Sequence, residues 1–170
     1  MIDTFRAVRQ AGIDAELHLG GPASGPEVQQ LVDGAIEEFQ DRLVYYGAVY
    51  GEDKQAFFNR LDLFIFPTRY RVEVQPLVIC EAMRCSVPVI AHGLACIPEL
   101  LGDSGMSVPP DDDFPATTVQ QVQQWVDSPD RFRQSKLATF QRSTFLRDES
   151  QEKMDEFLNR FIRNGHDQNS

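Results

Sequence analysis

Two glutamates, Glu73 and Glu81, flank a segment whose sequence predicts the amino end of a helix. Pro76 fits the first turn of that helix, because proline lacks an N–H and first-turn amides have no partner inside a helix. The remaining amides and the positive end of the helix dipole attract an anion such as a diphosphate. Glu81 follows more than one turn later, where it could reach a hydroxyl group. A polyhydroxylated phosphate ester, for example a nucleotide sugar, fits these features together.

Backbone amides and two arginines are the candidate ligands for the phosphates. We expect amide contacts from Gln75, Leu77 and Val78, around the proline. Arg69 and Arg71 could add charge, since a guanidinium binds phosphate through two parallel hydrogen bonds. A solvated loop explains these two arginines equally well. The chain carries a net charge of −10, so a bound phosphate needs a local positive feature of this kind.

Three further candidates lie near the same site. His92 and Gly93 end a predicted strand, where they could contact a sugar. A plain loop histidine is the favoured alternative for His92. Tyr70 could stack on a base, although packing of its own loop is the better interpretation.

Each glutamate also has a purely structural interpretation. Glu73 could be an exposed loop carboxylate, and Glu81 could form an ion pair with Arg84 or Arg69. The acidic run 111–113 fits a solvated loop better than a metal site. These alternatives stay open at the level of sequence.

Short apolar segments alternate with amphipathic ones along the chain, which predicts an α/β fold. Expected strands are 15–19, 43–46, 63–66, 87–91 and 106–108. Expected helices are 2–10, 26–40, 53–61, 76–85, 118–126, 129–140 and one from about 148. Such strands form a parallel sheet with helices on both faces, and ligands bind beyond their carboxyl ends. Loops 47–50, 68–73 and 92–96 therefore converge on one rim.

Composition indicates a globular domain of ordinary size, with 170 residues, 42% of them hydrophobic and 25% charged. The acidic net charge makes nucleic acid or an anionic membrane an unfavourable partner. No apolar run approaches the ~18 residues that span a bilayer. The three cysteines show no CxxC pair, which favours free thiols in a reducing compartment over a disulfide or a metal site. We therefore expect a soluble, cytoplasmic protein.

A longer pattern surrounds the two glutamates, which are separated by seven residues. Its segments are Phe66-Pro67-Thr68-Arg69-Tyr70, Pro76-Leu77-Val78, Glu81-Ala82-Met83, Val87-Pro88-Val89-Ile90-Ala91 and Ile97-Pro98-Glu99-Leu100. This pattern resembles the C-terminal, donor-binding half of the retaining glycosyltransferases of family 4. The resemblance covers roughly Leu17 to Phe161.

The resemblance implies a fold, a reaction and a set of ligands. The fold would be a Rossmann-like parallel sheet flanked by helices, the C-terminal half of a GT-B glycosyltransferase. A hexosyl unit would pass from a nucleoside diphosphate sugar to an acceptor hydroxyl with retained configuration, without a metal ion or other cofactor. Glu73 would be the catalytic residue beside the transferred sugar, and Glu81 would bind the ribose. The acceptor would be a carbohydrate or a lipid-linked molecule, as in polysaccharide biosynthesis, held by an N-terminal domain.

The sequence departs from this family in several places. No counterpart is found for the first strand of the donor-binding domain, or for the arginine and lysine that clamp the diphosphate. A sheet without that strand would expose unpaired backbone and an apolar slot, so we expect a fragment of a longer protein, inactive alone. Gln75 and Ser86 replace usual glycines. We divide the chain into a nucleotide-sugar-binding domain (1–147), a closing helix (148–163) and a disordered tail (164–170).

Two other functional classes remain as alternatives. The chain could be a non-catalytic module that keeps the fold and acts as a regulatory or assembly partner. It could also belong to a GT-B-shaped epimerase, which would isomerise its sugar nucleotide without an acceptor. Binding of nucleoside diphosphates and product analysis would separate these classes.

Overall fold

The computed structural model describes residues 1–70 and 76–166, and the side chains of the last helix as far as residue 160. Its strands are β1 (Leu17–Gly20), β2 (Leu43–Gly47), β3 (Phe64–Phe66), β4 (Val89–His92) and β5 (Met106–Val108). Its α-helices are α1 (Ile2–Gln10), α2 (Pro26–Phe39), α3 (Gly51–Phe58), α4 (Leu77–Arg84), α5 (Ile97–Leu101), α6 (Phe114–Asp127) and α7 (Pro129–His166). Short 3₁₀ turns follow α2 and α5.

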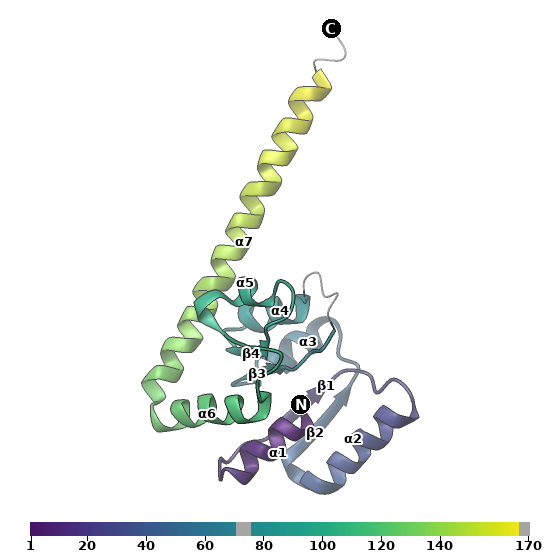
Figure 1. Cartoon of the computed structure of the whole chain (residues 1–170). Helices are drawn as coiled ribbons and strands as arrows, with labels where there is room; N and C mark the ends of the chain where they lie inside the picture. The colour runs from purple at the N-terminus through teal and green to yellow at the C-terminus, as the bar shows by residue number, and fades with distance from the viewer. Residues whose placement is uncertain (71–75, 167–170) are drawn as a thin grey trace.

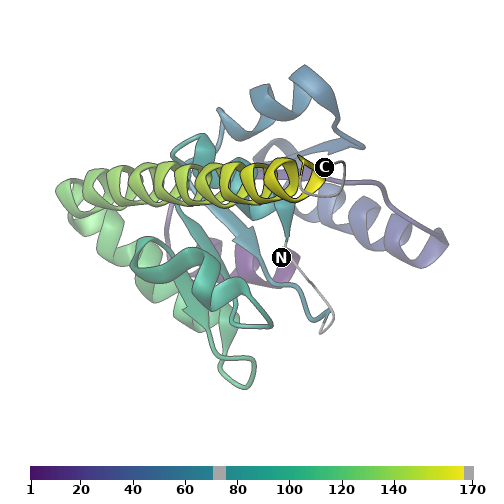
Figure 2. The same cartoon turned by 90° about the horizontal axis from the view of Figure 1, so that it is seen from above.

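The described strands form two parallel sheets instead of one. β1 pairs with β2, and β3, β4 and β5 form a second sheet with β4 at its centre. Ile90 of β4 lies opposite Ile65 on one side and Met106 on the other. Helices surround both sheets (Figures 1 and 2). The predicted α/β architecture is confirmed, but the predicted single sheet is divided, because β1 and β3 do not pair with each other among the described residues.

The larger core lies between β4 and the helices α4 and α5. All four residues of β4 are buried, as expected for a central parallel strand covered on both faces. Ile79 and Met83 of α4 and Ile97 and Leu101 of α5 are almost fully enclosed in this region. A smaller cluster, formed by Phe5, Leu17, Ala35 and Leu43, joins α1 and α2 to the two-stranded sheet.

Two helices differ from their sequence patterns. The pattern of α2 predicts a buried stripe of Val28, Leu31, Val32, Ile36 and Phe39, but Val28, Leu31 and Ile36 are exposed. Val32 and Ala35 are the buried residues of α2, which packs on β2. α6 begins at Phe114, four residues earlier than predicted, because the Asp113 carboxylate accepts a hydrogen bond from the Ala116 N–H at 3.0 Å.

α7 is one continuous helix where the sequence pattern predicts two. Residues 141–147 contain neither glycine nor proline, so nothing interrupts the backbone hydrogen bonds between the predicted pieces. The first half docks on the body through Thr139, whose hydroxyl donates to the carbonyl of Ser104 at 3.0 Å. The second half extends away from the rest of the molecule (Figure 1). The predicted boundary at residue 148 is therefore not a helix boundary.

Candidate functional site

The amino end of α4 lies where the sequence predicts an anion site. Pro76 is buried and forms the N-cap with φ −75° and ψ 94°, so it precedes the helix and does not lie within its first turn. No side chain of the described residues caps this end, and the first intrahelical bond runs from the Ile79 N–H to the Pro76 carbonyl at 2.9 Å. The N–H groups of Leu77 and Val78 come before that bond, so they have no acceptor within the helix.

Glu81 lies one turn into α4 and forms an ion pair with Lys54 of α3. The Lys54 Nζ and Glu81 Oε2 atoms are 2.6 Å apart, and about a third of each side chain is exposed. This Oε2 atom is buried, and Lys54 contacts it without hydrogen-bond geometry. Arg84, one partner proposed from the sequence, instead donates a hydrogen bond to Gln55 at 3.2 Å. Lys54 is a site residue that sequence reasoning missed, since nothing in the local pattern links it to Glu81.

Gln55 reinforces the contact between α3 and α4. Its Oε1 accepts from Arg84, and its Nε2 lies 2.8 Å from the Sγ of Cys85. Burial raises the pKa of the Cys85 thiol. The adjacent residues Lys54 and Gln55 thus both bind α4, which holds Glu81 in a defined place relative to the start of its helix.

His92 is buried, so it is neither a plain loop histidine nor an exposed ligand on the rim. Only 4% of its surface is accessible, and its ring packs on Phe114 with 4.6 Å between centroids. Burial lowers the pKa of His92. Its Nδ1 atom has no hydrogen-bond partner among the residues that the structure describes. A Cβ at its neighbour Gly93 would lie 2.5 Å from the Ser107 Oγ, so a larger residue there would require the serine side chain to turn.

The loop after β3 is described only in part. Arg69 and Tyr70 are exposed, and the Tyr70 N–H donates to the Thr68 hydroxyl at 3.2 Å. Tyr70 has 63% of its surface accessible, and most of the loop on which it was expected to pack lies outside the described residues. Arg71, Glu73 and Gln75 lie outside the described residues, so their predicted roles stay predictions.

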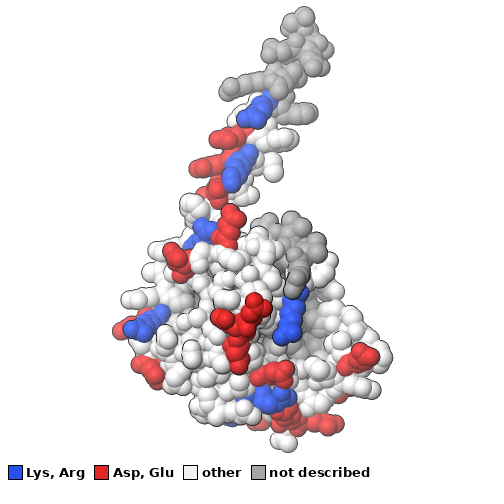
Figure 3. Space-filling view, viewed as in Figure 1, with Lys and Arg blue, Asp and Glu red and all other residues white. Residues whose placement is uncertain are grey.

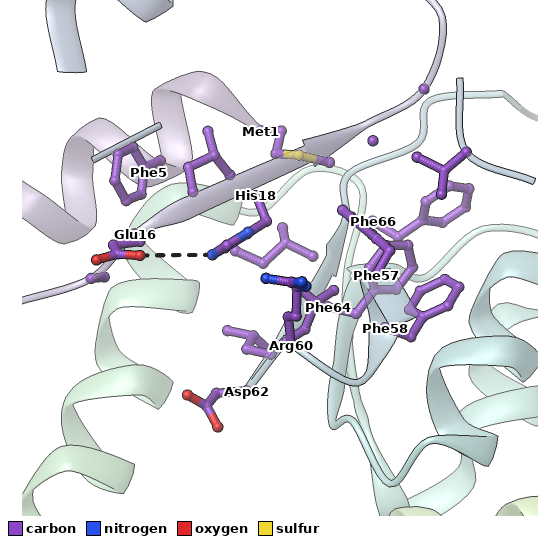
Figure 4. A pocket seen from close by; sticks show the side chains of 18 of the residues that line it. Met1, Phe5, Glu16, His18, Phe57, Phe58, Arg60, Asp62, Phe64 and Phe66 are labelled. Atoms are coloured by element: carbon purple, nitrogen blue, oxygen red, sulfur yellow. Dashed lines mark ion pairs between the residues drawn. The ribbon is translucent and has the colours of Figure 1, made fainter. Parts of the chain in front are cut away.

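A cavity of about 710 Å³ lies between β1 and β3 (Figure 4). Met1, Phe5 and His18 line one side of it, and Phe57 and Phe64 lie on the other. Lys54, the partner of Glu81, also lines this cavity. The cavity therefore reaches from the gap between the two sheets to the candidate site.

The described part of the chain contains no cluster of metal-ligating side chains that would form a second site. Within residues 1–70 and 76–166, no group of three or more His, Cys, Asp or Glu side chains could hold a metal ion. On the face shown in Figure 3, acidic and basic side chains are interspersed and form no broad basic surface among the coloured residues. No helix described here combines the length and the apolar character that crossing a bilayer requires.

The solved structures that share this fold include two glycosyl-transferring enzymes. Sucrose-phosphate synthase from Thermosynechococcus elongatus aligns with a TM-score of 0.73 at 22% identity, over 95% of this chain and 42% of that one. AviGT4, a glycosyltransferase involved in avilamycin A biosynthesis, aligns with a TM-score of 0.52 at 17% identity, over 91% of this chain and 48% of that one. The chain thus has the architecture of part of a GT-B glycosyltransferase.

Two curated proteins are similar in sequence. O-antigen chain mannosyltransferase B of Escherichia coli is 36% identical over 83 residues, which make up 49% of this chain and 21% of that protein. An uncharacterized 41.2 kDa protein in the cps region of Klebsiella pneumoniae is 38% identical over 71 residues, 41% of this chain and 19% of that protein. The matched segments thus span about a fifth of either relative. A family match covers a larger part of the chain, residues 1–128, and by this match the chain belongs to the family "Glycosyl transferases group 1".

Proposed function

We propose that this chain binds the nucleoside diphosphate sugar of a retaining hexosyltransferase, at the amino end of α4. The observation that carries the proposal is the start of α4, which no side chain among the described residues caps, with Glu81 held one turn away by Lys54. Membership of a glycosyltransferase family makes a sugar nucleotide the natural ligand for such an arrangement. The combination offers donors for a diphosphate and an acceptor for hydroxyl groups.

The amides of Leu77 and Val78 would bind the diphosphate. Leu77 is well exposed, so a ligand can approach this turn. Donors that already point at the leaving phosphate stabilise the charge that develops on it as the glycosidic bond breaks. Gln75, Arg69 and Arg71 are additional phosphate ligands in this proposal, on the basis of the sequence pattern alone.

Glu81 would accept hydrogen bonds from the ribose hydroxyls. A carboxylate offers about four lone-pair sites, so an ion pair to one oxygen leaves others for a ligand. Lys54 would hold the carboxylate in place. Glu73 would stand beside the transferred sugar and stabilise its positive charge, as the motif implies.

The acceptor and the setting follow from the relatives. The Escherichia coli relative is named a mannosyltransferase of the O-antigen chain, which favours a hexosyl donor and a carbohydrate or lipid-linked acceptor in polysaccharide biosynthesis. We propose cytoplasmic transfer that keeps the anomeric configuration and uses no metal ion or other cofactor. The leaving phosphate would help to take the acceptor proton, so no protein base is assigned.

Replacing Leu77 by proline tests the amide contact directly. Proline at the first helical position removes one N–H and leaves the helix intact. Isothermal titration with UDP, GDP and ADP should show, for the nucleotide that binds, an affinity at least about tenfold lower, the worth of one hydrogen bond to a charged group. Leu77→Ala removes the same exposed side chain but keeps the amide, so it should bind as the parent does.

Glu81→Gln tests the ribose contact in the same titrations. The variant should lose affinity for the nucleoside diphosphate but not for inorganic diphosphate, which has no ribose. Equal affinities of the parent, the Leu77→Pro variant and the Glu81→Gln variant for every ligand would contradict the proposed site.

A further inference from the structure

The hydroxyl of Tyr45, in β2, holds the loop that follows β1. It donates a hydrogen bond to the carbonyl of Gly21 and accepts one from the N–H of Ala23, each at 3.0 Å. A phenol offers one donor and acceptor lone pairs, so both bonds can form at the same time. A single half-buried side chain thus fixes the loop backbone 22 to 24 positions earlier in the chain.

The pairing of β1 with β2 is irregular just before this loop. Leu19 lies opposite Tyr45, but Gly20 lies opposite Gly47, so Tyr46 is an extra residue in the register. Such a bulge redirects the chain that follows it. Gly21 has a φ of +135°, a conformation that glycine adopts without strain. The two bonds of Tyr45 therefore restrain the backbone at the point where it is conformationally most free.

The same loop borders the cavity next to the candidate site. Residues 20–22 line the cavity, as does Lys54 of α3. A Cβ at Gly20 would lie 3.1 Å from the ring of Phe57, so the backbone there packs directly on α3. Phe57 follows Lys54 by three residues, which places both side chains on one face of the helix. The loop is therefore close to Lys54 and to its partner Glu81.

We propose that Tyr45 is a positioning residue of the nucleotide site, which holds residues 20–22 as the wall against which the nucleoside part of the ligand binds. This inference rests on the proposed function, in which Glu81 binds the ribose. Among the described residues that line the cavity, Tyr45 is not included, so it acts through the loop and not by direct contact.

The composition of the loop favours a nucleoside over a phosphate. Residues 20–25 are Gly-Gly-Pro-Ala-Ser-Gly, which carry no charged side chain. They offer backbone groups and the apolar ring of Pro22, which suit the neutral nucleoside. The diphosphate would remain with the amides at the start of α4, so the two parts of the ligand would bind to different elements.

The hydroxyl should affect binding through the order of the loop. A loop that is held in place before the ligand arrives lowers the entropic cost of binding. Without the hydroxyl, the nucleotide would have to order residues 21–23 itself. The aromatic ring of Tyr45 would remain packed on the cluster of Phe5, Leu17, Ala35 and Leu43, so the fold should persist.

Tyr45→Phe tests the inference, because it removes the hydroxyl and keeps the ring. The matched control is Tyr46→Phe, which removes a hydroxyl that lies 2.8 Å from the Nδ1 of His18. In isothermal titrations of the full chain with UDP, GDP and ADP, Tyr45→Phe should weaken binding of the parent's nucleotide by about fivefold or more. Tyr46→Phe should bind as the parent does. Inorganic diphosphate, which has no nucleoside, should bind equally to all three proteins.

Amide hydrogen exchange provides a readout that a general loss of stability would not mimic. Without nucleotide, exchange at Ala23 should be about tenfold faster in Tyr45→Phe than in the parent, with unchanged rates at 43–46. With nucleotide, exchange at 21–24 should slow in the parent. Far-UV circular dichroism of both tyrosine variants checks that they fold.

Several outcomes would overturn the inference. Tyr45→Phe could bind the nucleotide as tightly as the parent, both tyrosine variants could lose affinity equally, or the loss could extend to inorganic diphosphate. Unchanged exchange at 21–24 when nucleotide binds the parent would also contradict it. In each case the proposed function stands if Leu77→Pro still weakens nucleotide binding. If the parent bound no nucleotide, the proposed function would fail and this inference with it.

Discussion

At the scale of single residues, the ion pair between Lys54 and Glu81 is the main described feature that orients a side chain of the candidate site. The 2.6 Å contact joins side chains on two different helices, and Gln55 holds the same helices together next to it. Glu81 is therefore oriented before any ligand arrives. Such preorganisation would lower the entropic cost of binding the proposed nucleotide, because the carboxylate need not be immobilised on binding.

His92 should make the stability of the protein depend on pH. Burial lowers the pKa of His92 in the folded state, whereas in the unfolded state it titrates near about 6.5. As the pH falls below that value, the unfolded chain takes up a proton that the folded chain resists, so folding stability decreases. Urea unfolding at pH 7, 6 and 5 should show a smaller loss for His92→Gln than for the parent. Parallel losses in both proteins would contradict this expectation.

At the scale of secondary-structure elements, the carboxyl end of α4 sets the direction of the chain between the candidate site and the central strand β4. The Ser86 N–H donates to the Met83 carbonyl and the Val87 N–H to the Ala82 carbonyl, which together form a Schellman motif. Ser86 has a φ of +60°, a conformation that glycine adopts without strain. The serine at this usual glycine position thus costs backbone strain and leaves the turn itself unchanged.

Ser86→Gly should therefore stabilise the protein. Relief of the left-handed strain, about 1 kcal/mol or more, outweighs the larger entropy of glycine in the unfolded chain. We expect the free energy of unfolding in urea to rise by about 0.5 kcal/mol. Ser86→Ala keeps the strain and should give no increase. If alanine stabilised as much as glycine, the explanation by backbone conformation would be wrong.

The molecule consists of a packed body and the long helix α7, of which only the first half packs on that body (Figure 1). Thr139 and Arg142 anchor α7, and the Arg142 guanidinium donates to the carbonyls of Glu99 and Leu100 at the end of α5. Farther along α7, residues 150–160 are almost all exposed, and they include Met154 and Leu158.

Hydrogen exchange should therefore differ along α7. Amides near Thr139 share the stability of the body, whereas those at 150–160 should exchange much faster, because a helix without tertiary contacts is marginal in water. Thr139→Val removes the bond to Ser104 and should cost about 1 kcal/mol of global stability. It should speed exchange at 135–146 and leave 150–160 unchanged. Uniform protection along the helix would contradict this division.

Local patterns in the sequence predict most of the elements and the start of the candidate site. The strand at Met106–Val108 has the predicted bounds, and α4 begins within one residue of the predicted position. These features depend on periodicity and on the backbone chemistry of proline, which neighbouring residues determine by themselves. The spacing of Glu73 and Glu81 can likewise be read directly from the sequence.

Tertiary packing decided the rest. Lys54 meets Glu81 from 27 positions earlier in the chain, and the ring of the buried His92 packs on Phe114, 22 positions later. The division into two sheets likewise depends on which strand edges find partners. The sequence by itself determined which segments form helices and strands and where a glycosyltransferase motif lies. Only the tertiary structure decided which side chains meet and which edges stay open, because those contacts depend on the packing of residues that are distant along the chain.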